Sequence, residues 1–462
     1  MKIAFVEPAN RYVGWSTGIF KQLFMLGPVY LGTLLKQAGH EVEIYKEALK
    51  APKLEKLDCD VLGLTTLTSG APRAYELARQ FRLANPEGEV LMGGVHATAL
   101  PHEALRHADT VLVGEAENAI LDVVGPTNGD GHLARHGLIQ GTPCCLDALP
   151  MPDFGLVRGL KKIVYLPIST SRGCPFGCRF CSVTAMFGRG YRFRSTKLVI
   201  EELQRTKSKK IFFYDDNFCA HKARTAELMH KMVDAGVSRP WTAQTRVDVA
   251  NNEPLLTAMV RAGCERLFLG FESISEKTLK LYRKGQSLLD IKRAIRALKD
   301  RGIKIMAGFV LGSDEDDRNT FDATVEFCQE MEIDQPQLSV LTPFPGCEIY
   351  EEFKTEGRLL SQDWSLYDGM HVVFKPKKLS AAELQARYVD ALKELWWSGR
   401  RRLFMLFGLG MSFLGSISIA SSILRWYREK QRYIEKLREL EKRSMQKLKH
   451  STQRLVASAK GI

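Results

Sequence analysis

The chain has 462 residues, of which 45% are hydrophobic and 26% charged, a composition typical of a globular protein with two or three domains. Its net charge of +13 is uneven, because residues 425–462 contain 12 Lys or Arg and 4 Asp or Glu, a balance of +8 that leaves only +5 elsewhere. The basic character therefore belongs to a tail, and we expect no nucleic-acid partner.

The ten cysteines form no compact disulfide pattern. Such a chain is typical of a reducing compartment, and we expect a cytoplasmic location. Residues 2–8 are apolar enough to form a strand, so we expect no export signal there.

Residues 1–125 alternate between apolar strands and helices. The expected strands are residues 2–8, 41–47, 61–67, 89–95 and 110–115, and the clearest helices are 28–38 and 72–84. This alternation predicts an α/β domain with a doubly wound parallel sheet, whose ligands would bind at the carboxyl ends of the strands. No G-x-G-x-x-G follows the first strand, which argues against a dinucleotide site.

Small and polar residues follow several of these strands. Glycines and small hydroxyl side chains there would let a large planar ligand approach the backbone. A single histidine in such a loop is more often a polar loop residue than a metal ligand. The candidate binding residues are Thr65, Thr66, Ser69, Gly93, Gly94, His96, Gly114 and Glu115.

Residues 126–164 are rich in Pro, Gly and Asp and have weak periodicity. They are predicted to be a linker between two domains. The linker contains Cys144 and Cys145, which are adjacent and therefore poorly placed to chelate one metal together.

Residues 165–375 contain six strand–helix units. The expected strands are residues 165–170, 210–216, 241–247, 266–273, 304–312 and 335–343, and the clearest helices are 197–206, 223–235, 288–301 and 318–331. Six such units with right-handed crossovers predict a partial (βα)6 barrel. Functional groups in such barrels gather at the carboxyl ends of the strands.

The first barrel strand is followed by Cys174, Cys178 and Cys181, spaced C-x3-C-x2-C. Three thiolates on one short loop can bind three irons of a [4Fe–4S] cluster and leave the fourth iron open. A structural zinc site would need a fourth Cys or His nearby, and the next cysteine is Cys219.

With the aromatic residue Phe180 before its last cysteine, this motif resembles the radical S-adenosylmethionine (SAM) superfamily. The resemblance implies that the open iron chelates the amino and carboxylate groups of SAM, whose one-electron cleavage gives a 5′-deoxyadenosyl radical. It also implies that Phe180 contacts the cofactor and that SAM contacts lie at the later strand ends: Asp215 and Asp216 for the amino group, Arg246 for the carboxylate, Glu272 and Ser273 for the ribose, and Gly308 and Gly312 for the adenine.

The first domain resembles the cobalamin-binding domain that precedes the radical SAM domain in one large subfamily. The shared features lie at residues 28–32, 93–96 and 114–117. The D-x-H-x-x-G motif that supplies a histidine below the cobalt is absent, so cobalamin would bind without a lower histidine ligand. The alternative is a domain with only a structural role.

Residues 376–462 are predicted to be a helical, basic region. Ser380 is a good helix start, with Glu383 completing a capping box, and this helix should end near residue 397. Residues 403–424 carry no charge and are long enough to span a bilayer, but their Gly and Ser content also permits an interfacial or a buried helix. A charged helix follows at 429–449, either in contact with anionic lipids or as a solvated helix or short coiled coil.

Together these features predict a cobalamin-binding radical SAM enzyme, similar to anaerobic magnesium-protoporphyrin cyclases and hopanoid-type radical SAM proteins. The predicted reaction is C-methylation of an unactivated carbon in a small apolar substrate, which could be a lipid, an isoprenoid or a tetrapyrrole. The expected cofactors are a [4Fe–4S] cluster, SAM and cobalamin. Flavodoxin or ferredoxin would donate electrons, and residues 400–462 would touch the inner face of the membrane.

Two other functions remain open at this stage. One is a cobalamin-dependent radical cyclase or oxidase, and the other is an iron–sulfur regulatory module without turnover. The sequence singles out no catalytic acid or base.

Overall fold

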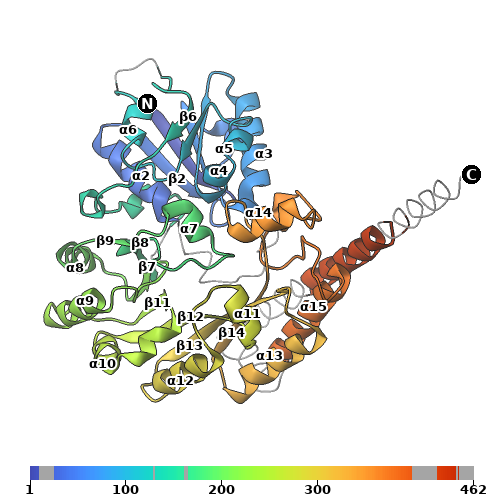
Figure 1. The fold of residues 1–462 in the computed structure, drawn as a ribbon. Coiled ribbons are helices and arrows are strands. Elements are labelled where there is room, and N and C mark those ends of the chain that lie inside the picture. The colour runs from blue at the N-terminus through green and yellow to red at the C-terminus, as the bar shows by residue number, and fades with distance from the viewer. Residues whose placement is uncertain (10–24, 128–130, 161–164, 398–423, 444–445, 447–462) are drawn as a thin grey trace, which may run out of the picture.

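The structure is a computed structural model that describes residues 1–9, 25–127, 131–160, 165–397, 424–443 and 446. It contains two six-stranded sheets, in which every strand pair is parallel, and a helical C-terminal region. Figure 1 shows the N-terminal sheet at one end, the second sheet at the other, and helices α7 (Ser182–Phe187) and α14 (Glu348–Thr355) between them. The predicted fold class is confirmed.

The N-terminal sheet has the strand order β2-β1-β3-β4-β5-β6. Its strands are β1 (Lys2–Glu7), β2 (Glu41–Lys46), β3 (Val61–Thr65), β4 (Glu89–Gly93), β5 (Thr110–Val113) and β6 (Gly137–Gln140). The helices that cover it are α2 (Leu26–Gln37), α3 (Ala71–Ala84), α4 (Val95–Ala99), α5 (Pro101–Ala104) and α6 (Ile120–Val124).

Strand β1 shows why this sheet is covered on both faces. Its residues are apolar throughout, and successive side chains of a strand point to opposite faces. Ile3 and Phe5 pack into the core that contains α2 and α6, whereas Ala4 and Val6 pack into the core that contains α3 to α5. The sheet therefore separates two hydrophobic cores, as a doubly wound domain requires.

Strand β6 was not predicted, because residues 137–140 were placed in the linker. This strand contains one buried side chain, Ile139, so its sequence carries little strand signal. Its backbone nevertheless pairs in parallel with β5 and extends the sheet beyond residue 125.

The second sheet has the strand order β14-β13-β12-β11-β10-β7, with β7 and β14 at opposite edges, so the barrel is open. Its strands are β7 (Tyr165–Ile168), β10 (Lys210–Phe213), β11 (Trp241–Thr245), β12 (Cys264–Glu272), β13 (Lys304–Leu311) and β14 (Gln335–Val340). The helices that follow its strands are α8 (Thr196–Arg205), α9 (Lys222–Asp234), α10 (Glu253–Arg261), α11 (Glu276–Leu281), α12 (Leu288–Lys299) and α13 (Arg318–Glu330). A separate antiparallel pair, β8 (Ser171–Arg172) and β9 (Arg192–Phe193), lies directly after β7.

Helix α15 (Ala381–Trp397) begins at the predicted N-cap, where the hydroxyl of Ser380 accepts a hydrogen bond from the Glu383 amide at 3.2 Å. The predicted capping box is only half formed, because the Glu383 carboxylate pairs with Arg318 of α13 instead. Pairing with a charged partner on a neighbouring helix holds this carboxylate away from the N-cap amide.

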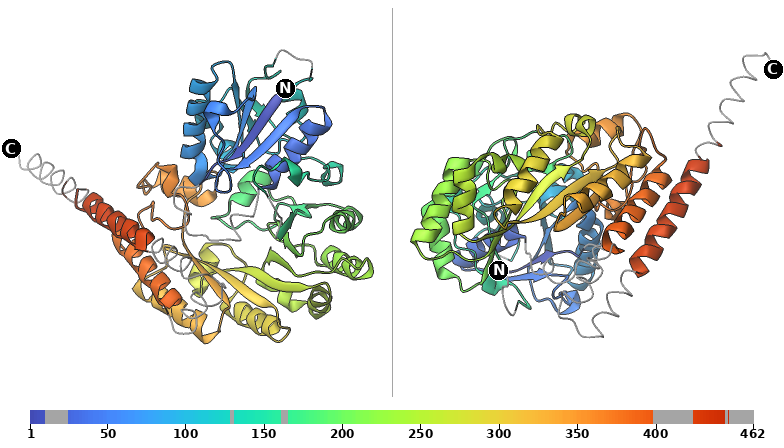
Figure 2. Two further views of the ribbon diagram at one scale, coloured as in Figure 1. Left: turned by 180° about the vertical axis from the view of Figure 1, so that it is seen from behind. Right: turned by 90° about the horizontal axis from the view of Figure 1, so that it is seen from below.

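The C-terminal helix (residues 424–443) packs antiparallel to α15. Figure 2 shows the two helices side by side. Lys393 donates to the Tyr427 hydroxyl at 3.1 Å, and the amide of Ala382 donates to Glu441 at 3.1 Å. This charged helix also carries a thin apolar stripe, of which Ile434 and Leu437 are buried in the barrel core. The stripe thus packs against the protein itself.

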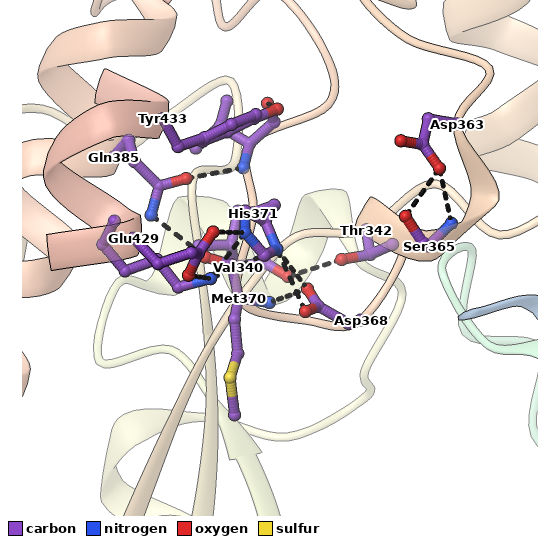
Figure 3. Close-up of polar contacts among 12 residues, drawn as sticks. Val340, Thr342, Asp363, Ser365, Asp368, Met370, His371, Gln385, Glu429 and Tyr433 are labelled. Atoms are coloured by element: carbon purple, nitrogen blue, oxygen red, sulfur yellow. Dashed lines mark hydrogen bonds and ion pairs between the residues drawn. The ribbon is translucent and has the colours of Figure 1, made fainter. Parts of the chain in front are cut away.

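A buried polar network fixes the C-terminal helix in place. Figure 3 shows His371 between Asp368, 3.0 Å from its Nδ1, and Glu429, 2.9 Å from its Nε2. Burial alone would lower the pKa of His371, but the two carboxylates outweigh it and the pKa is raised. Lys430 lies fully buried, 2.6 Å from the same imidazole, and the Tyr433 hydroxyl donates to the Val372 carbonyl at 2.9 Å.

Among the residues that the structure describes, no helix combines the length and apolar character needed to cross a bilayer. Nearly all of the uncharged segment 403–424 lies outside the described residues, so its predicted placements stay predictions.

Candidate functional site

The three clustered cysteines lie on one loop between β8 and α7. Cys174, Cys178 and Cys181 are all half-buried free thiols. The amide of Cys181 donates to the Cys178 carbonyl at 3.2 Å, which folds the loop back on itself. The pKa of Cys181 is raised to about 11, mainly by burial and to a lesser extent by Cys178, Asp216 and Cys174, whereas a hydrogen bond from the Val183 amide opposes this shift. The three predicted ligands therefore share one short loop that is folded back on itself.

Nitrogen donors lie next to two of these sulfurs. The Asn217 side-chain amide is 3.9 Å from the Cys174 sulfur, and the Arg246 guanidinium is 4.0 Å from the Cys178 sulfur. Arg246 also lies 3.8 Å above the ring of Phe176. Donors directed at sulfur stabilise thiolates and tune a bound cluster. Soft thiolates with such donors fit a [4Fe–4S] cluster, which these three cysteines would hold.

Phe180 packs inward from the same loop. Its ring meets the fully buried ring of Tyr282 edge-on, with the centroids 4.9 Å apart. The backbone of its neighbour Arg179 donates to the Tyr282 carbonyl at 3.3 Å and accepts from the Ile349 amide at 3.2 Å. The loop is thus pinned to α11 and α14, and Phe180 acts as its anchor in the barrel wall.

Asp215 has a different position from the one predicted for a SAM contact. Its carboxylate is fully buried and accepts from the amides of Thr170 and Ser171 at 2.6 and 3.0 Å and from the Thr170 hydroxyl at 2.5 Å. Arg224 donates to the same hydroxyl at 2.8 Å. Because its oxygens are already occupied and shielded, Asp215 anchors the segment that leads into the cysteine loop.

The next residue, Asp216, faces the cysteine loop. It is partly exposed and accepts a hydrogen bond from the Gly173 amide at 3.2 Å. Burial raises the pKa of Asp216 to about 6, although the hydrogen bond from Gly173 opposes this shift. Of the two predicted carboxylates, this one remains open to a ligand amino group.

Glu272 and Ser273 lie at the end of β12, where the backbone departs from regular geometry. Glu272 has a φ of 64° and follows a bulge in the pairing of β12 with β13. Its carboxylate forms a buried ion pair with Lys284 at 2.7 Å. The Ser273 hydroxyl accepts from the Ser275 amide at 3.1 Å. Non-glycine residues with a positive φ are concentrated at functional sites, which agrees with a place for Glu272 beside the ligand.

The two glycines predicted to contact adenine pack against side chains of the protein. A Cβ on Gly308 would lie 3.1 Å from the ring of Phe268, and a Cβ on Gly312 would lie 2.7 Å from Leu384 of α15. Gly312 also has a φ of +99°. Because these two glycines have no side chains, Phe268 and Leu384 can pack closely against them.

In the N-terminal domain, the ends of β3 and β4 are fastened together. The Thr66 amide and hydroxyl donate to the Gly93 carbonyl at 2.8 and 2.9 Å, and the Thr66 carbonyl accepts from the His96 amide at 3.1 Å. Gly94 has a φ of +99°, and a Cβ there would lie 2.8 Å from the Thr66 backbone. Only glycine fits this close approach.

The neighbouring positions at this edge are open. Thr65 and Ser69 are half-buried, and Leu67 between them is 48% exposed although apolar. Gly114 ends β5 with a φ of +83°, and its amide donates to Thr98 at 3.0 Å. An uncovered apolar side chain beside glycines and small hydroxyls fits the broad face of a corrin ring, which these residues would hold.

His96 does not face this edge. It is fully buried, its Nε2 lies 3.1 Å from the Tyr75 hydroxyl, and its ring meets Trp364 at 5.3 Å. Burial lowers the pKa of His96. Trp364 donates to Glu103 at 2.7 Å, so this group bridges the two domains. His96 was predicted to contact the cofactor, but in the structure it is part of the domain interface.

Glu115 also lies in the interface between the domains. It is buried and accepts from Arg172 at 2.8 Å and from Arg192. Burial alone would raise the pKa of Glu115, but the two arginines outweigh it and the pKa is lowered. Because both arginines occupy its carboxylate, we no longer assign Glu115 to cobalamin binding.

Several residues of the site were not among those predicted from the sequence. Arg172 stands two residues before Cys174, Glu117 follows Glu115 in the same motif, and Asn217 ends the strand-end run that contains both aspartates. A charged or amide side chain beside a cluster motif is the signal that would have found them. The sequence offers no comparable signal for Lys284.

The two domains each match a known family. Residues 168–328 match the radical SAM superfamily, and residues 21–124 match the B12 binding domain. The first match contains the cysteine loop, and the second contains the glycine-rich edge of the N-terminal sheet.

Three characterised relatives extend these matches along the chain. Bacteriochlorophyllide d C-12(1)-methyltransferase of Chlorobaculum tepidum is 31% identical over 73% of this chain and 75% of its own. Anaerobic magnesium-protoporphyrin IX monomethyl ester cyclase of Rubrivivax gelatinosus is 27% identical over 88% and 78%. Hopanoid C-3 methylase of Methylococcus capsulatus is 27% identical over 88% and 84%.

Among solved structures, the fold is similar to that of the radical SAM methyltransferase TsrM from Kitasatospora setae, described with cobalamin and a [4Fe–4S] cluster bound. The TM-score is 0.63 at 16% identity, over 95% of this chain and 99% of that one. The two domain matches and the relative that is 31% identical show that this chain is a cobalamin-binding radical SAM enzyme, one of a family of methyltransferases and some cyclases whose cofactors are a [4Fe–4S] cluster, SAM and cobalamin.

Proposed function

We propose that this enzyme replaces a hydrogen on an unactivated carbon of an apolar substrate with a methyl group. The proposed substrates are a lipid, an isoprenoid or a tetrapyrrole. Two relatives are named for methylation of bacteriochlorophyllide d and of a hopanoid, and both compounds are large and mainly apolar. The observation that carries the proposal is the ion pair between Arg172 and Glu115, which joins the cysteine loop to the open edge of the cobalamin-binding sheet.

When bound, SAM and cobalamin supply the radical and the methyl group. One SAM would leave as methionine and 5′-deoxyadenosine, which takes up the substrate hydrogen, and a second would leave as S-adenosylhomocysteine after giving its methyl group. The enzyme also needs low-potential electrons, for which we propose reduced flavodoxin or ferredoxin. The residues of the chain hold and orient these groups and exclude water.

Arg246 and Asp216 are the residues we propose to orient SAM. The Nε of Arg246 is buried and makes no hydrogen bond in the described structure, with the Asp248 carboxylate 3.9 Å away, and the same guanidinium reaches Cys178. A buried donor without a partner is destabilising, and a ligand carboxylate would satisfy it. Asp216 lies at the start of the same loop, where its carboxylate could accept from the ligand amino group.

The test is an anaerobic assay of the enzyme reconstituted with iron, sulfide and hydroxocobalamin. Bacteriochlorophyllide d and a hopanoid are supplied separately with reduced flavodoxin and SAM that carries a CD3 group. Methylation predicts a product in which one hydrogen is replaced by CD3, together with 5′-deoxyadenosine. A product that has lost hydrogen or gained oxygen without the label would contradict methylation.

The second candidate function is radical cyclisation or oxidation. The cyclase from Rubrivivax gelatinosus is similar over 88% of this chain, the same share as the hopanoid methylase. Magnesium-protoporphyrin IX monomethyl ester is therefore added as a third test substrate. An unlabelled product with altered hydrogen or oxygen content would support this alternative.

We further propose that the C-terminal helix makes peripheral contact with an anionic membrane surface. Its buried side faces the barrel through Trp426, Tyr433 and Leu437. The opposite side is exposed and mainly basic, and its charged residues are Arg425, Arg428, Arg432, Glu435, Lys436, Arg438, Glu439, Lys442 and Arg443. Clustered cations near an uncharged segment favour anionic headgroups.

Membrane contact is tested by co-sedimentation with vesicles of phosphatidylcholine alone or mixed with phosphatidylglycerol. Changing Arg425, Arg428 and Arg432 together to Gln should reduce binding to the mixed vesicles, because one exposed side of the helix loses three charges. The control removes the same charge from exposed Arg261, Lys277 and Lys280 of the barrel. Equal binding of the two triple variants would rule out this helix as the contact surface.

A further inference from the structure

Two glutamates of the N-terminal domain and two arginines of the barrel domain form an ionic group at the seam between the domains, and Cys144 accepts from both arginines, through its sulfur at 3.6 Å from Arg172 and its carbonyl at 2.7 Å from Arg192. Arg172 donates to Glu115 at 2.8 Å and to Glu117 at 2.5 Å, and Arg192 donates to Glu115 as well. Only 12% of the Arg172 side chain is exposed, against 4% for Glu115 and 7% for Glu117. We call the four charged residues the interdomain clamp.

The two arginines are placed to receive a carboxylate. Arg172 of β8 and Arg192 of β9 are direct partners across the antiparallel pair. Like charges directly opposite each other on two strands repel. The Glu115 carboxylate offers one oxygen to each arginine and relieves this repulsion. The short β8–β9 ribbon therefore depends on the N-terminal domain for its electrostatic balance.

The connection from the clamp to the cluster ligands is short and stiff. Arg172 is separated from Cys174 by Gly173 alone, whose φ is +85°. A Cβ on this glycine would lie 2.2 Å from the carbonyl oxygen of Gly190, so the backbone here is closely packed. Its amide is also held by Asp216 at 3.2 Å. We therefore expect a displacement of Arg172 to displace Cys174 as well.

From this arrangement we propose that the clamp is a positioning device. It ties the cysteine loop to the cobalamin-binding domain and so sets the separation between the [4Fe–4S] cluster and the cobalamin. Arginine suits this role because its planar guanidinium fixes the direction of both carboxylates, which the point charge of a lysine would not do. The proposal rests on the family's cofactors and not on the methylation chemistry, so a failure of one does not entail a failure of the other.

A second bridge between the domains provides a comparison. Trp364 donates to Glu103 at 2.7 Å, and the buried His96 lies against the same tryptophan. This bridge joins α5 to the segment after β14, far in sequence from the cysteine loop. If the clamp merely held the domains together, breaking either bridge would have the same effect on the cluster.

The experiment uses the full chain, reconstituted with cluster and cobalamin, and needs no substrate. Pulsed electron paramagnetic resonance measures the distance distribution between cob(II)alamin and the reduced cluster, and a chelator assay measures the rate of iron loss. The clamp variants are E117Q, which keeps shape but removes charge, and R172K, which keeps charge but removes the planar fork. Glu103→Gln breaks the second bridge, and Glu76→Gln changes an exposed ion pair within the first domain at 2.8 Å from Arg79.

We expect both clamp variants to broaden the distance distribution and to lose iron about tenfold faster, the size typical for groups that orient metal ligands. Glu103→Gln should leave the rate of iron loss unchanged, and Glu76→Gln should match the wild type in both measurements. The proposal is overturned if E117Q gives the distance distribution of Glu76→Gln. It is also overturned if Glu103→Gln accelerates iron loss as much as E117Q. Should R172K fail to fold, E117Q alone decides the outcome.

Discussion

The carboxyl edges of the two parallel sheets meet at one seam but carry different chemistry. The barrel edge is rich in charged groups, with Asp215, Asp216, Arg246 and Glu272 at the ends of three strands. The edge of the N-terminal sheet presents glycines, small hydroxyls and the exposed Leu67. A charged cluster and a zwitterionic ligand need charge at fixed positions, whereas a broad ring needs space and close backbone. The two edges are thus suited to two different cofactors.

The largest effect is expected from a substitution that disrupts the barrel edge alone. Changing Cys178 to Ala leaves two of three thiolates, so the cluster should be lost and the iron content should fall from about four per chain toward zero. Cobalamin binding should persist, because its edge is built from another domain. Iron analysis and corrinoid absorbance measure both, with Cys145→Ala, at an exposed cysteine, as the control. Retained 5′-deoxyadenosine formation in Cys178→Ala would refute the cluster assignment.

A smaller effect is expected from a substitution at Asp215, which anchors the segment that leads into the cysteine loop. In Asp215→Asn one of the two accepting oxygens becomes an amide nitrogen, so a buried donor of Thr170 or Ser171 loses its acceptor, which should lower the free energy of unfolding by about 1–3 kcal/mol. Urea unfolding of the protein without cofactors measures this. The control is Asp234→Asn, which removes a carboxylate from an exposed position at the end of α9. Similar stability in both variants would show that Asp215 is not an anchor.

Adding one carbon at Gly94 should disrupt the carboxyl edge of the N-terminal sheet. Gly94→Ala places a Cβ 2.8 Å from the Thr66 backbone at a φ of +99°, which should destabilise the domain by about 1–3 kcal/mol and weaken corrinoid binding. The cluster should assemble normally. Gly137→Ala is the matched control, because it also has a positive φ but nothing within 4 Å of the added carbon. Equal corrinoid content in the two variants would contradict the role of Gly94.

The smallest effect concerns the pH dependence of the seam. Arg172 and Arg192 hold the pKa of Glu115 below 4.5 against the effect of burial. A lowered pKa stabilises the fold above the unfolded value, and this contribution is lost as the pH falls through the folded value. The wild type should therefore exceed Glu115→Gln in free energy of unfolding by the largest amount above about pH 5, and this difference should shrink below pH 4.5. Thermal unfolding of the protein without cofactors, from neutral to acid pH, measures this, and a gap independent of pH would contradict it.

Much of the fold could be predicted because its signals are local. The alternation of apolar strands and helices determines both parallel sheets, and a short loop with three cysteines can be recognised without knowing its surroundings. Strand β6 was missed because its only buried side chain is Ile139, and its pairing with β5 depends on backbone that the sequence does not reveal. Half of the predicted capping box was lost because Glu383 found a partner on another helix.

The sequence by itself determined the two domain families, the cysteine motif that is predicted to hold the cluster, and the family's cofactors, because these depend on residue type and spacing. Only the tertiary structure decided which polar residues face a ligand and which hold the protein together. Asp215, His96 and Glu115 all lie at strand ends, but each is buried against partners from segments far away in the chain. A buried polar group must find such partners to offset the loss of water, and the partners are chosen by packing and not by spacing.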